Sequence, residues 1–342
     1  MRVVGIDTHK ATLAACALDE VGQVVAERTF TNDPAGFPAL LGWLHELADV
    51  GRVGLEGSAG YGAAAARFLL DAGLPAVEVP PQLSHRERGR TRRAGKSDPG
   101  DALAIARVVL REAELPPVRV ADASRELQLL VEARDDLAAE TTRVRNRLHA
   151  DLVVLAPGYS AVAANLVADK HRRTAGQLLR RLPGVQAELA RGRLTRLAQL
   201  TTEIRVLDRR IAALVADHPL RALWGAGPLV TAKLIGEVGD IRRFRSADAF
   251  AMLAGVAPVP ASSGQVSRMR LNRGGNRQIN RALHGIVLAQ VRTYPPAQAF
   301  VARKRAEGKS WREALRALKR HLARIVFRLL TQAVVQPSSV GA

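Results

Sequence analysis

Four acidic residues in the first third of the chain have the types and spacing of a metal-dependent phosphoryl-transfer site. Asp7 ends an apolar stretch with the pattern of a β-strand, and Glu56 ends another. Asp98 and Asp101 are three positions apart, which places their side chains on one face of a helix. Carboxylate oxygens are the ligands that Mg²⁺ prefers, and two such ions clamp the attacking and leaving oxygens of a phosphodiester. The four carboxylates therefore predict a Mg²⁺ site, provided that the fold brings them together.

Each of these acids also has a purely structural interpretation. Asp98 could cap a helix, and Asp101 in the following turn would then complement the helix dipole. Glu56 could be a turn residue, and Asp7 could end its strand in a local side-chain turn. Taken singly, none of the four residues decides between the two interpretations.

The elements that must position these acids are typical of an α/β domain with a ribonuclease H-like order. Three short strands joined by tight turns are predicted at 2–7, 12–18 and 23–31. Helix and strand then alternate, with helices at 36–48 and 63–72 and strands at 52–56 and 76–80. A basic loop is expected over 85–98, followed by a helix from 98 to about 112.

The formal charge of +19 is distributed very unevenly along the 342 residues. Residues 1–160 carry 19 Lys and Arg against 22 Asp and Glu, a net charge of −3. Residues 161–342 carry 32 against 10, a net charge of +22. Most of these cations are Arg, whose planar guanidinium suits phosphate, so the second half is predicted to bind nucleic acid. A solvated surface rich in Arg is the alternative.

The second half is predicted to be mainly helical. Heptad-like spacing of Leu, Ile and Val over 125–155 and 194–216 indicates two helices that pair as an antiparallel coiled coil, within one chain or between chains. Residues 220–240 fit a helix-hairpin-helix in which Gly225 and Gly227 let backbone N–H groups face a DNA phosphate. An ordinary turn between two helices is the alternative.

Basic residues are concentrated around one serine-containing turn and on the last helix. Ser262 and Ser263 precede Gly264 in a polar turn, and by type alone each is an ordinary turn residue. The last helix, 311–334, has one apolar and one basic face. The residues predicted to contact nucleic acid, besides the two hairpin glycines, are Arg268, Arg270, Arg273, Arg277, Arg281, Arg312, Arg316, Lys319 and Arg320.

Composition bounds the compartment and excludes several classes of protein. The single cysteine, Cys16, allows no intramolecular disulfide and fits a reducing compartment. Nothing resembles a signal peptide or a membrane span, so a cytoplasmic protein with no membrane partner is expected. The spacing of the eight histidines and the cysteine does not suggest a zinc site.

Three stretches of the first half resemble the RuvC-like DEDD domain of one family of bacterial insertion-sequence transposases. They are VVGIDTHKATLAACALDEVGQVV (3–25), VGLEGSAGYG (53–62) and KSDPGDALAIA (96–106). This is the family that also contains the Piv-type invertases and is known for bridge-RNA-guided recombination. Its pattern of an Asp in the first strand, a Glu in a later strand and K-x-D-x-x-D-A falls here on Asp7, Glu56, Asp98 and Asp101.

Residues 250–283 resemble the second domain of the same family, in which the motif G-[LV]-x-P-x-x-x-x-S-G carries a catalytic serine. The resemblance places that role on Ser263, with Ser262 as the alternative register. It implies a serine that attacks the DNA backbone while the DEDD carboxylates hold Mg²⁺. It also implies a homo-oligomer, a dimer or tetramer, and a structured guide RNA that directs the choice of donor and target DNA.

We therefore expect a DNA transposase with three parts. A RuvC-like DEDD domain spans 1–115, a helical coiled-coil linker spans 120–217, and a mainly α serine-containing domain with the helix-hairpin-helix and basic helices spans 218–336. A metal-only nuclease of the junction-resolvase kind and a non-catalytic nucleic-acid-binding protein remain the alternatives. An actin-like kinase is disfavoured because the sequence has no second phosphate-binding glycine loop.

Overall fold

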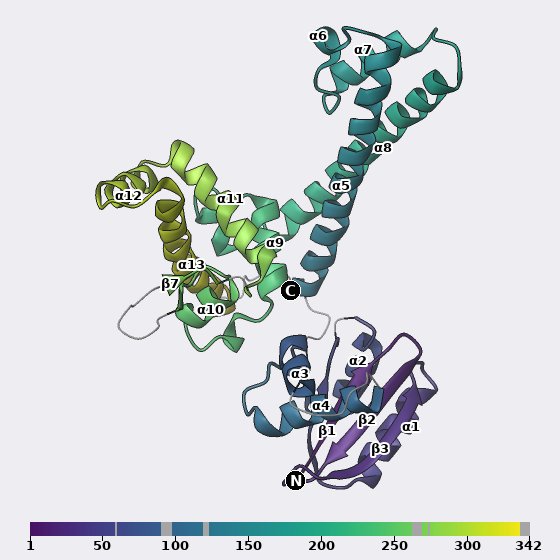
Figure 1. The fold of residues 1–342 in the computed structure, drawn as a ribbon, viewed down its shortest axis with the longest axis vertical. Helices are drawn as coiled ribbons and strands as arrows, with labels where there is room; N and C mark the ends of the chain where they lie inside the picture. Colours follow the sequence, from purple (N-terminus) through teal and green to yellow (C-terminus); the bar gives the residue numbers. More distant parts are fainter. Residues whose placement is uncertain (59, 90–97, 119–122, 262–268, 273, 336–342) are drawn as a thin grey trace. The chain divides into compact units, whose positions relative to one another are not determined.

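The N-terminal unit of this computed structural model, Met1–Asp122, is built on a mixed five-stranded sheet (Figure 1). The structure describes residues 1–58, 60–89, 98–118, 123–261, 269–272 and 274–335. In the strand order β3-β2-β1-β4-β5, β1 is antiparallel to β2 and parallel to β4. The strands are β1 (Arg2–Thr8), β2 (Thr12–Leu18), β3 (Val24–Thr31), β4 (Val50–Leu55) and β5 (Ala76–Glu78). The predicted meander followed by parallel strands is confirmed.

Helices cover both faces of this sheet. Successive side chains of β1 point to opposite faces, and both sets are apolar and buried. Val4 and Ile6 pack into one core with α1 and α2, and Val3 packs into a second core with α4. Both faces of β1 are therefore apolar, so its polar side chains, Arg2, Asp7 and Thr8, lie at its ends. The helices are α1 (Gly36–Glu46), α2 (Ala63–Asp71), α3 (Pro81–Arg88) and α4 (Asp98–Arg111).

The expected basic loop over 85–98 is wrong in its first part, because α3 continues through Arg88. Pro81 stands at the first position of this helix, where a missing N–H costs nothing. His85, Arg86 and Arg88 lie in its last turn, where positive charge complements the helix dipole. The same basic residues that suggested a loop therefore suit a short helix. Residues 90–97 lie outside the described part of the chain.

The reactivity of the Cys16 thiol is a measure of how well the core of this unit excludes solvent. It lies in β2, fully buried, and burial, followed by the nearby carboxylate of Glu27, raises the pKa of its thiol to about 12. Because only the thiolate attacks disulfide reagents, we expect native labelling at pH 8 to be on the order of 10³-fold slower than that of a free thiol. The measurement is the rate of reaction with a chromogenic disulfide reagent, with the unfolded chain in denaturant as control. Rapid stoichiometric labelling of the native chain would contradict this burial.

The second unit, Ala123–Ala342, begins with two long helices that lie side by side and antiparallel (Figure 1). They are α5 (Ala123–Leu155) and α8 (Val185–Leu214), and α6 (Ser160–Ala163) and α7 (Asp169–Leu179) lie at their far end. Ion pairs set the antiparallel direction: Arg134 Nε lies 3.1 Å from Asp208 Oδ1, and Arg196 Nε lies 2.8 Å from Glu140 Oε1. The helix pair is present, while its assignment as a coiled coil remains a prediction.

The rest of the second unit is a helical body with a small hairpin. Phe250, Ile279, Leu318 and similar side chains form its apolar core. Its elements are two short 3-10 helices, η1 (Pro219–Ala222) and η2 (Ile241–Arg243), the helices α9 (Pro228–Val238), α10 (Ala247–Leu253), α11 (Arg277–Thr293), α12 (Pro295–Ala306) and α13 (Trp311–Val335), and the strands β6 (Val259–Pro260) and β7 (Met269–Arg270).

Helix α9 connects this body to the long helix pair. A Cβ on Gly236 would lie 2.9 Å from the Cα of Gln128, so α9 packs directly against α5. Lys233 Nζ also lies 2.6 Å from Asp135 Oδ2. These contacts explain why residues 123–342 form one compact unit, and the further division expected at residue 218 remains a prediction. No helix among the described residues combines the length and the apolar character needed to cross a membrane.

Candidate active site and nucleic-acid interface

Two of the predicted acids lie at the same edge of the sheet. The parallel register pairs Ile6 of β1 with Leu55 of β4, so Asp7 and Glu56 follow side by side at the carboxyl ends of the strands. The backbone N–H of Glu56 donates to the Ile6 carbonyl at 3.3 Å, and Thr8 Oγ1 donates to the Glu56 carbonyl at 2.7 Å. The fold therefore brings these two residues together, as the sequence predicted.

Helix α4 brings a third acid towards the same edge. A Cβ on Gly5 would lie 2.2 Å from the Ala106 backbone nitrogen, so α4 rests directly on β1. At the other end of α4, the Glu112 carbonyl accepts from Arg52 Nη1 at 2.9 Å, beside the start of β4. The helix therefore runs antiparallel to β1 and β4, and its first turn, with Asp101, lies towards the edge where both strands end.

Each described carboxylate of this edge has a partner within the chain. His9 Nε2 lies 3.0 Å from Asp7 Oδ2. From α3, Ser84 Oγ donates to Glu56 Oε2 at 2.6 Å, and Arg88 Nη1 lies 3.0 Å from Asp101 Oδ1. Helix α3 thus contacts two of the three described carboxylates, Glu56 and Asp101.

The donor set suits Mg²⁺, because every predicted ligand is a carboxylate oxygen. Among the side chains that the structure describes, however, no group of three or more His, Cys, Asp or Glu residues is arranged to hold a metal ion. Asp98 is the first residue of α4, and its side chain is outside the part of the chain that the structure describes. The edge therefore has the right elements and donors, and the convergence of all four carboxylates remains a prediction.

Glu78 is an acid at this edge that the sequence analysis missed. It ends β5, next to β4, and accepts hydrogen bonds from the backbone N–H groups of Gly57 at 3.3 Å and Ser58 at 3.1 Å, and from the Ser58 hydroxyl. Burial raises its pKa, against the hydrogen bonds from Ser58 and Gly57, which lower it. Glu78 thereby fixes the turn that directly follows Glu56. Its position at a strand end, like that of Glu56, was the available signal.

The second unit contributes a cationic groove. A cavity of about 870 Å³ lies between the β6–β7 hairpin and the helices α12 and α13. Glu313 is the acidic member of its described lining, and its carboxylate is engaged with the backbone N–H and hydroxyl of Ser310. The groove therefore carries a large excess of positive charge, as a polyanion site requires. Its Lys and Arg residues are Arg270, Lys304, Lys309, Arg316, Lys319, Arg320 and Arg324.

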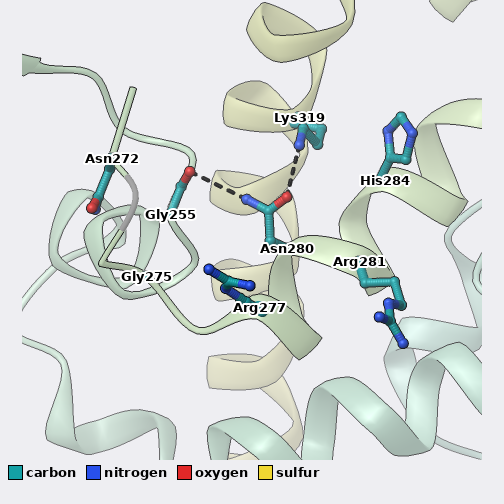
Figure 2. A pocket seen from close by; sticks show the side chains of 8 residues that line it. All are labelled: Gly255, Asn272, Gly275, Arg277, Asn280, Arg281, His284 and Lys319. Carbon is teal, nitrogen blue, oxygen red and sulfur yellow. Dashed lines mark hydrogen bonds between the residues drawn. The ribbon is translucent and has the colours of Figure 1, made fainter. Parts of the chain in front are cut away.

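A second cavity, of about 690 Å³, opens at the start of α11 (Figure 2). Arg277, Arg281, His284 and Lys319 line it, and none of its described lining residues is acidic. Lys319 lines both cavities, so the structure brings together predicted contacts from three separate segments: β7, α11 and α13.

Several predicted residues fall elsewhere. Ser262, Ser263, Arg268 and Arg273 lie outside the described residues, although the β6–β7 pairing on either side of residues 261–268 is described. Arg312 is exposed on α13 and lines neither cavity.

The two predicted hairpin glycines precede α9. Gly225 has φ +87°, and Gly227 is the residue that caps the start of the helix. The element before them is the 3-10 helix η1 instead of an α-helix, and neither glycine lines the two cavities. The helix-hairpin-helix assignment is thus unconfirmed.

Comparison with known families defines the class of protein. A DEDD transposase model matches residues 4–157, and a model described as "Transposase IS116/IS110/IS902 family" matches residues 217–302. The chain is therefore a transposase, an enzyme of DNA recombination. It belongs to the IS110/IS116/IS902 family, and the predicted membership is confirmed.

Relatives match over nearly the whole chain. A protein of insertion element IS900 from Mycobacterium paratuberculosis is 28% identical, covering 99% of this chain and 98% of the relative. The pilin gene-inverting protein of Moraxella bovis is 25% identical, covering 96% and 95%. Among solved structures, Thermus thermophilus RuvC matches 34% of this chain and 99% of its own, at 16% identity and a TM-score of 0.28. A TM-score this low carries no weight for the fold.

Proposed function

We propose that this transposase cuts and rejoins DNA through a phosphodiester link to Ser263, with Mg²⁺ held by Asp7, Glu56, Asp98 and Asp101. The observation that carries the proposal is the gathering of Asp7, Glu56 and the first turn of α4 at one sheet edge. The chain also matches, in order, the two transposase models, one over each of the segments that contain these residues.

In the proposed chemistry the number of ester bonds to phosphorus stays the same at each step. The Ser263 hydroxyl loses its proton and its oxygen forms a bond to phosphorus, while the bond from phosphorus to one deoxyribose oxygen breaks and that oxygen takes up a proton. A hydroxyl from another strand then attacks the phosphoserine, which restores the serine and joins the new strands. Because each bond broken is matched by one formed, no external energy source is needed.

Metal and protein share the electrostatic work in this proposal. When bound, Mg²⁺ supplies positive charge to the phosphate oxygens. The carboxylates of Asp7, Glu56, Asp98 and Asp101 would hold it, and Glu78 would keep the turn after Glu56 in place. Arg88 pairs with Oδ1 of Asp101, so Oδ2 is the oxygen of that carboxylate that would bind the metal while the ion pair persists.

The proposed partners are donor and target DNA, a structured guide RNA and further copies of the chain. The charge of the second half, 32 Lys and Arg against 10 Asp and Glu, supports a polyanion partner. The adjoining groove and pocket, which are lined by nine of these Lys and Arg residues, support a polyanion site on the second unit. Gene inversion, which the name of the Moraxella bovis relative states for that protein, supports rearrangement of DNA as the reaction class. The guide RNA and the oligomer rest on the family resemblance.

A metal-only nuclease is the second candidate, because the described carboxylates would suit it without a serine. The test is a strand-exchange assay with the full chain, donor and target DNA, Mg²⁺ and a transcript of the DNA flanking the gene. We expect joined products only when all components are present. Cleavage without joining would favour the nuclease, and joining without the transcript would contradict the guide RNA.

A further inference from the structure

The pocket at the start of α11 combines basic side chains from two helices with a fixed backbone wall, and the net positive charge of the second unit does not by itself explain this arrangement. Its basic side chains come from two helices: Arg277, Arg281 and His284 from α11, and Lys319 from α13 (Figure 2). Arg277 and Arg281 are one helical turn apart on α11, and Figure 2 shows Arg277 extending towards the wall with Gly255 and Gly275 while Arg281 extends away from that wall. The cavity thus presents several positive donors to one volume of about 690 Å³.

Asn280 holds the lysine of this pocket in a fixed position. Its Oδ1 accepts from Lys319 Nζ at 2.9 Å, and its Nδ2 donates to the Gly255 carbonyl at 3.2 Å (Figure 2). The same Nδ2 also donates to the Ala254 carbonyl at 2.9 Å. Both ends of the amide are therefore in use, and the amide oxygen that receives the ammonium carries no charge. Lys319 is half-buried, and burial, followed by the charge of Arg316, lowers its pKa. An anion in the pocket would relieve this uncompensated burial of positive charge.

The opposite wall of the pocket is fixed backbone. A Cβ on Gly275 would lie 2.3 Å from the Cα of Gly255, so the two segments touch in a way that only glycine allows. Asn272 bridges the same wall: its Nδ2 donates to the Met252 carbonyl at 2.8 Å, and its Oδ1 accepts from the Gly274 N–H at 3.0 Å. The cavity is thus formed before any ligand arrives, which lowers the entropic cost of binding.

The attraction for an anion comes from side chains and not from the end of α11. Asn276 caps that helix, and its Oδ1 accepts from the N–H groups of Gln278 at 2.8 Å and Ile279 at 3.0 Å. These backbone donors are therefore occupied. The cations of the pocket are the groups left to bind a ligand.

The pocket opens onto the cationic groove. Gly255, Asn272, Asn280 and Lys319 line both cavities. A nucleic-acid strand lying in the groove would therefore pass Lys319. This continuity favours a phosphate within a polynucleotide over a free phosphate ion as the ligand.

We propose that the pocket is a binding site for one backbone phosphate of the nucleic-acid substrate, held by Arg277, Arg281 and Lys319, with Asn280 as the residue that positions Lys319. This inference rests on the proposed function and deepens it, because it names the chemical group that the second unit holds. A backbone phosphate carries no base identity, and Asn280 is not free to read a base because both ends of its amide are engaged within the protein.

The test compares Lys319→Gln with Lys170→Gln in the full chain, which also contains the wild-type serine. Lys170 is exposed on α7 and lines neither cavity, so its variant loses the same charge away from the pocket. The affinity for a short fluorescein-labelled DNA duplex is measured by fluorescence anisotropy over a range of salt concentrations. Loss of one phosphate contact is expected to weaken binding about 10-fold and to reduce the salt slope by about 1, whereas Lys170→Gln leaves the slope unchanged.

A second variant tests the positioning role. Asn280→Asp keeps Lys319 but places a carboxylate against its ammonium, so it is expected to reduce the salt slope as Lys319→Gln does. Thermal denaturation of both variants checks that they fold. If Asn280→Asp does not fold, the comparison of Lys319→Gln with the wild type decides the test. Equal slopes for Lys319→Gln and the wild type would overturn the proposal.

A third experiment uses inorganic phosphate alone as a competitor. It distinguishes a site for a phosphate of the nucleic-acid backbone from a site for a free phosphate ion. We expect it to compete with DNA weakly, and less against Lys319→Gln than against the wild type. Strong competition together with an unchanged DNA salt slope in Lys319→Gln would show a site for free phosphate and overturn the assignment to the backbone. Because binding needs no strand chemistry, a wild-type chain that binds DNA normally but does not recombine it would contradict the proposed function and leave the pocket standing.

Discussion

Replacing Ser263 by alanine is expected to reduce the rate of strand exchange by a factor on the order of 10³ or more. The hydroxyl is the proposed nucleophile, and alanine removes it without adding bulk, so the covalent step has no substitute. The measurement is the initial rate of recombinant formation, followed by quantitative amplification across the new junction. DNA affinity of the variant should remain within about 2-fold of the wild type, because the charge of the second unit does not change.

Ser262→Ala is the matched control for this prediction. It removes the same hydroxyl one residue earlier, in the alternative register of the motif. We expect it to retain most of the strand exchange. If Ser262→Ala abolishes the reaction and Ser263→Ala does not, the register is wrong; if both variants recombine normally, the metal-only nuclease becomes the better account.

Asp7→Asn is expected to lower Mg²⁺-dependent strand exchange by about 10²-fold or more, because it removes one negative charge from the proposed ligand set. Asp7 is 8% exposed at the end of β1, and Asn has nearly the same shape, so the fold should be retained. Two measurements are needed: the rate as a function of Mg²⁺ concentration, and the binding of Mn²⁺ alone by calorimetry, which reports on the site without any reaction.

Asp71→Asn is the control for the loss of a carboxylate. Asp71 is exposed at the end of α2 and ends no strand of the sheet. Its variant should match the wild type in both measurements. Unchanged metal binding in Asp7→Asn would remove Asp7 from the ligand set, and unchanged activity as well would favour a non-catalytic role for the acidic edge.

The sheet was predictable from sequence because its signals are local. The strands that contain Val4 and Leu55 are apolar and rich in Val and other aliphatic residues, and each ends at a turn close to the predicted place. Long helices were predictable in existence but less so in extent. Helix α8 begins at Val185, nine residues before the predicted start at 194, because its first turns bury Ala187 and Ala190. Small residues of this kind give a weak heptad pattern.

The environment of the acidic residues could not be read in the same way. That Asp7 and Glu56 end strands is local, but that β1 and β4 are neighbours in the sheet is not. The contact of Arg88 with Asp101 depends on the packing of α3 against α4, and the last residues of α3, from His85 on, were expected to lie in a loop. Glu78 was missed because β5 is only three residues long and its acid resembles a surface residue.

The cationic pocket shows a further limit of sequence reasoning. The Arg and Lys residues were identifiable from their density, but Asn280 was not, because its role depends on Lys319, 39 positions away. The close approach of Gly255 and Gly275 is likewise a tertiary feature. Charge could therefore be assigned to the second half, whereas the shape that uses the charge required the structure.

The most direct test of the central claim is to map the covalent protein–DNA link. The full chain, donor and target DNA, the flanking transcript and Mg²⁺ are incubated and denatured, and the DNA-linked material is digested with nuclease and trypsin. The expected tryptic peptide, residues 246–268, contains Ser246, Ser262, Ser263 and Ser267, so fragmentation by mass spectrometry must locate the nucleotide. Our account predicts a nucleotide joined through phosphate to Ser263. Strand exchange that proceeds without any adduct, or an adduct on another residue, would contradict it.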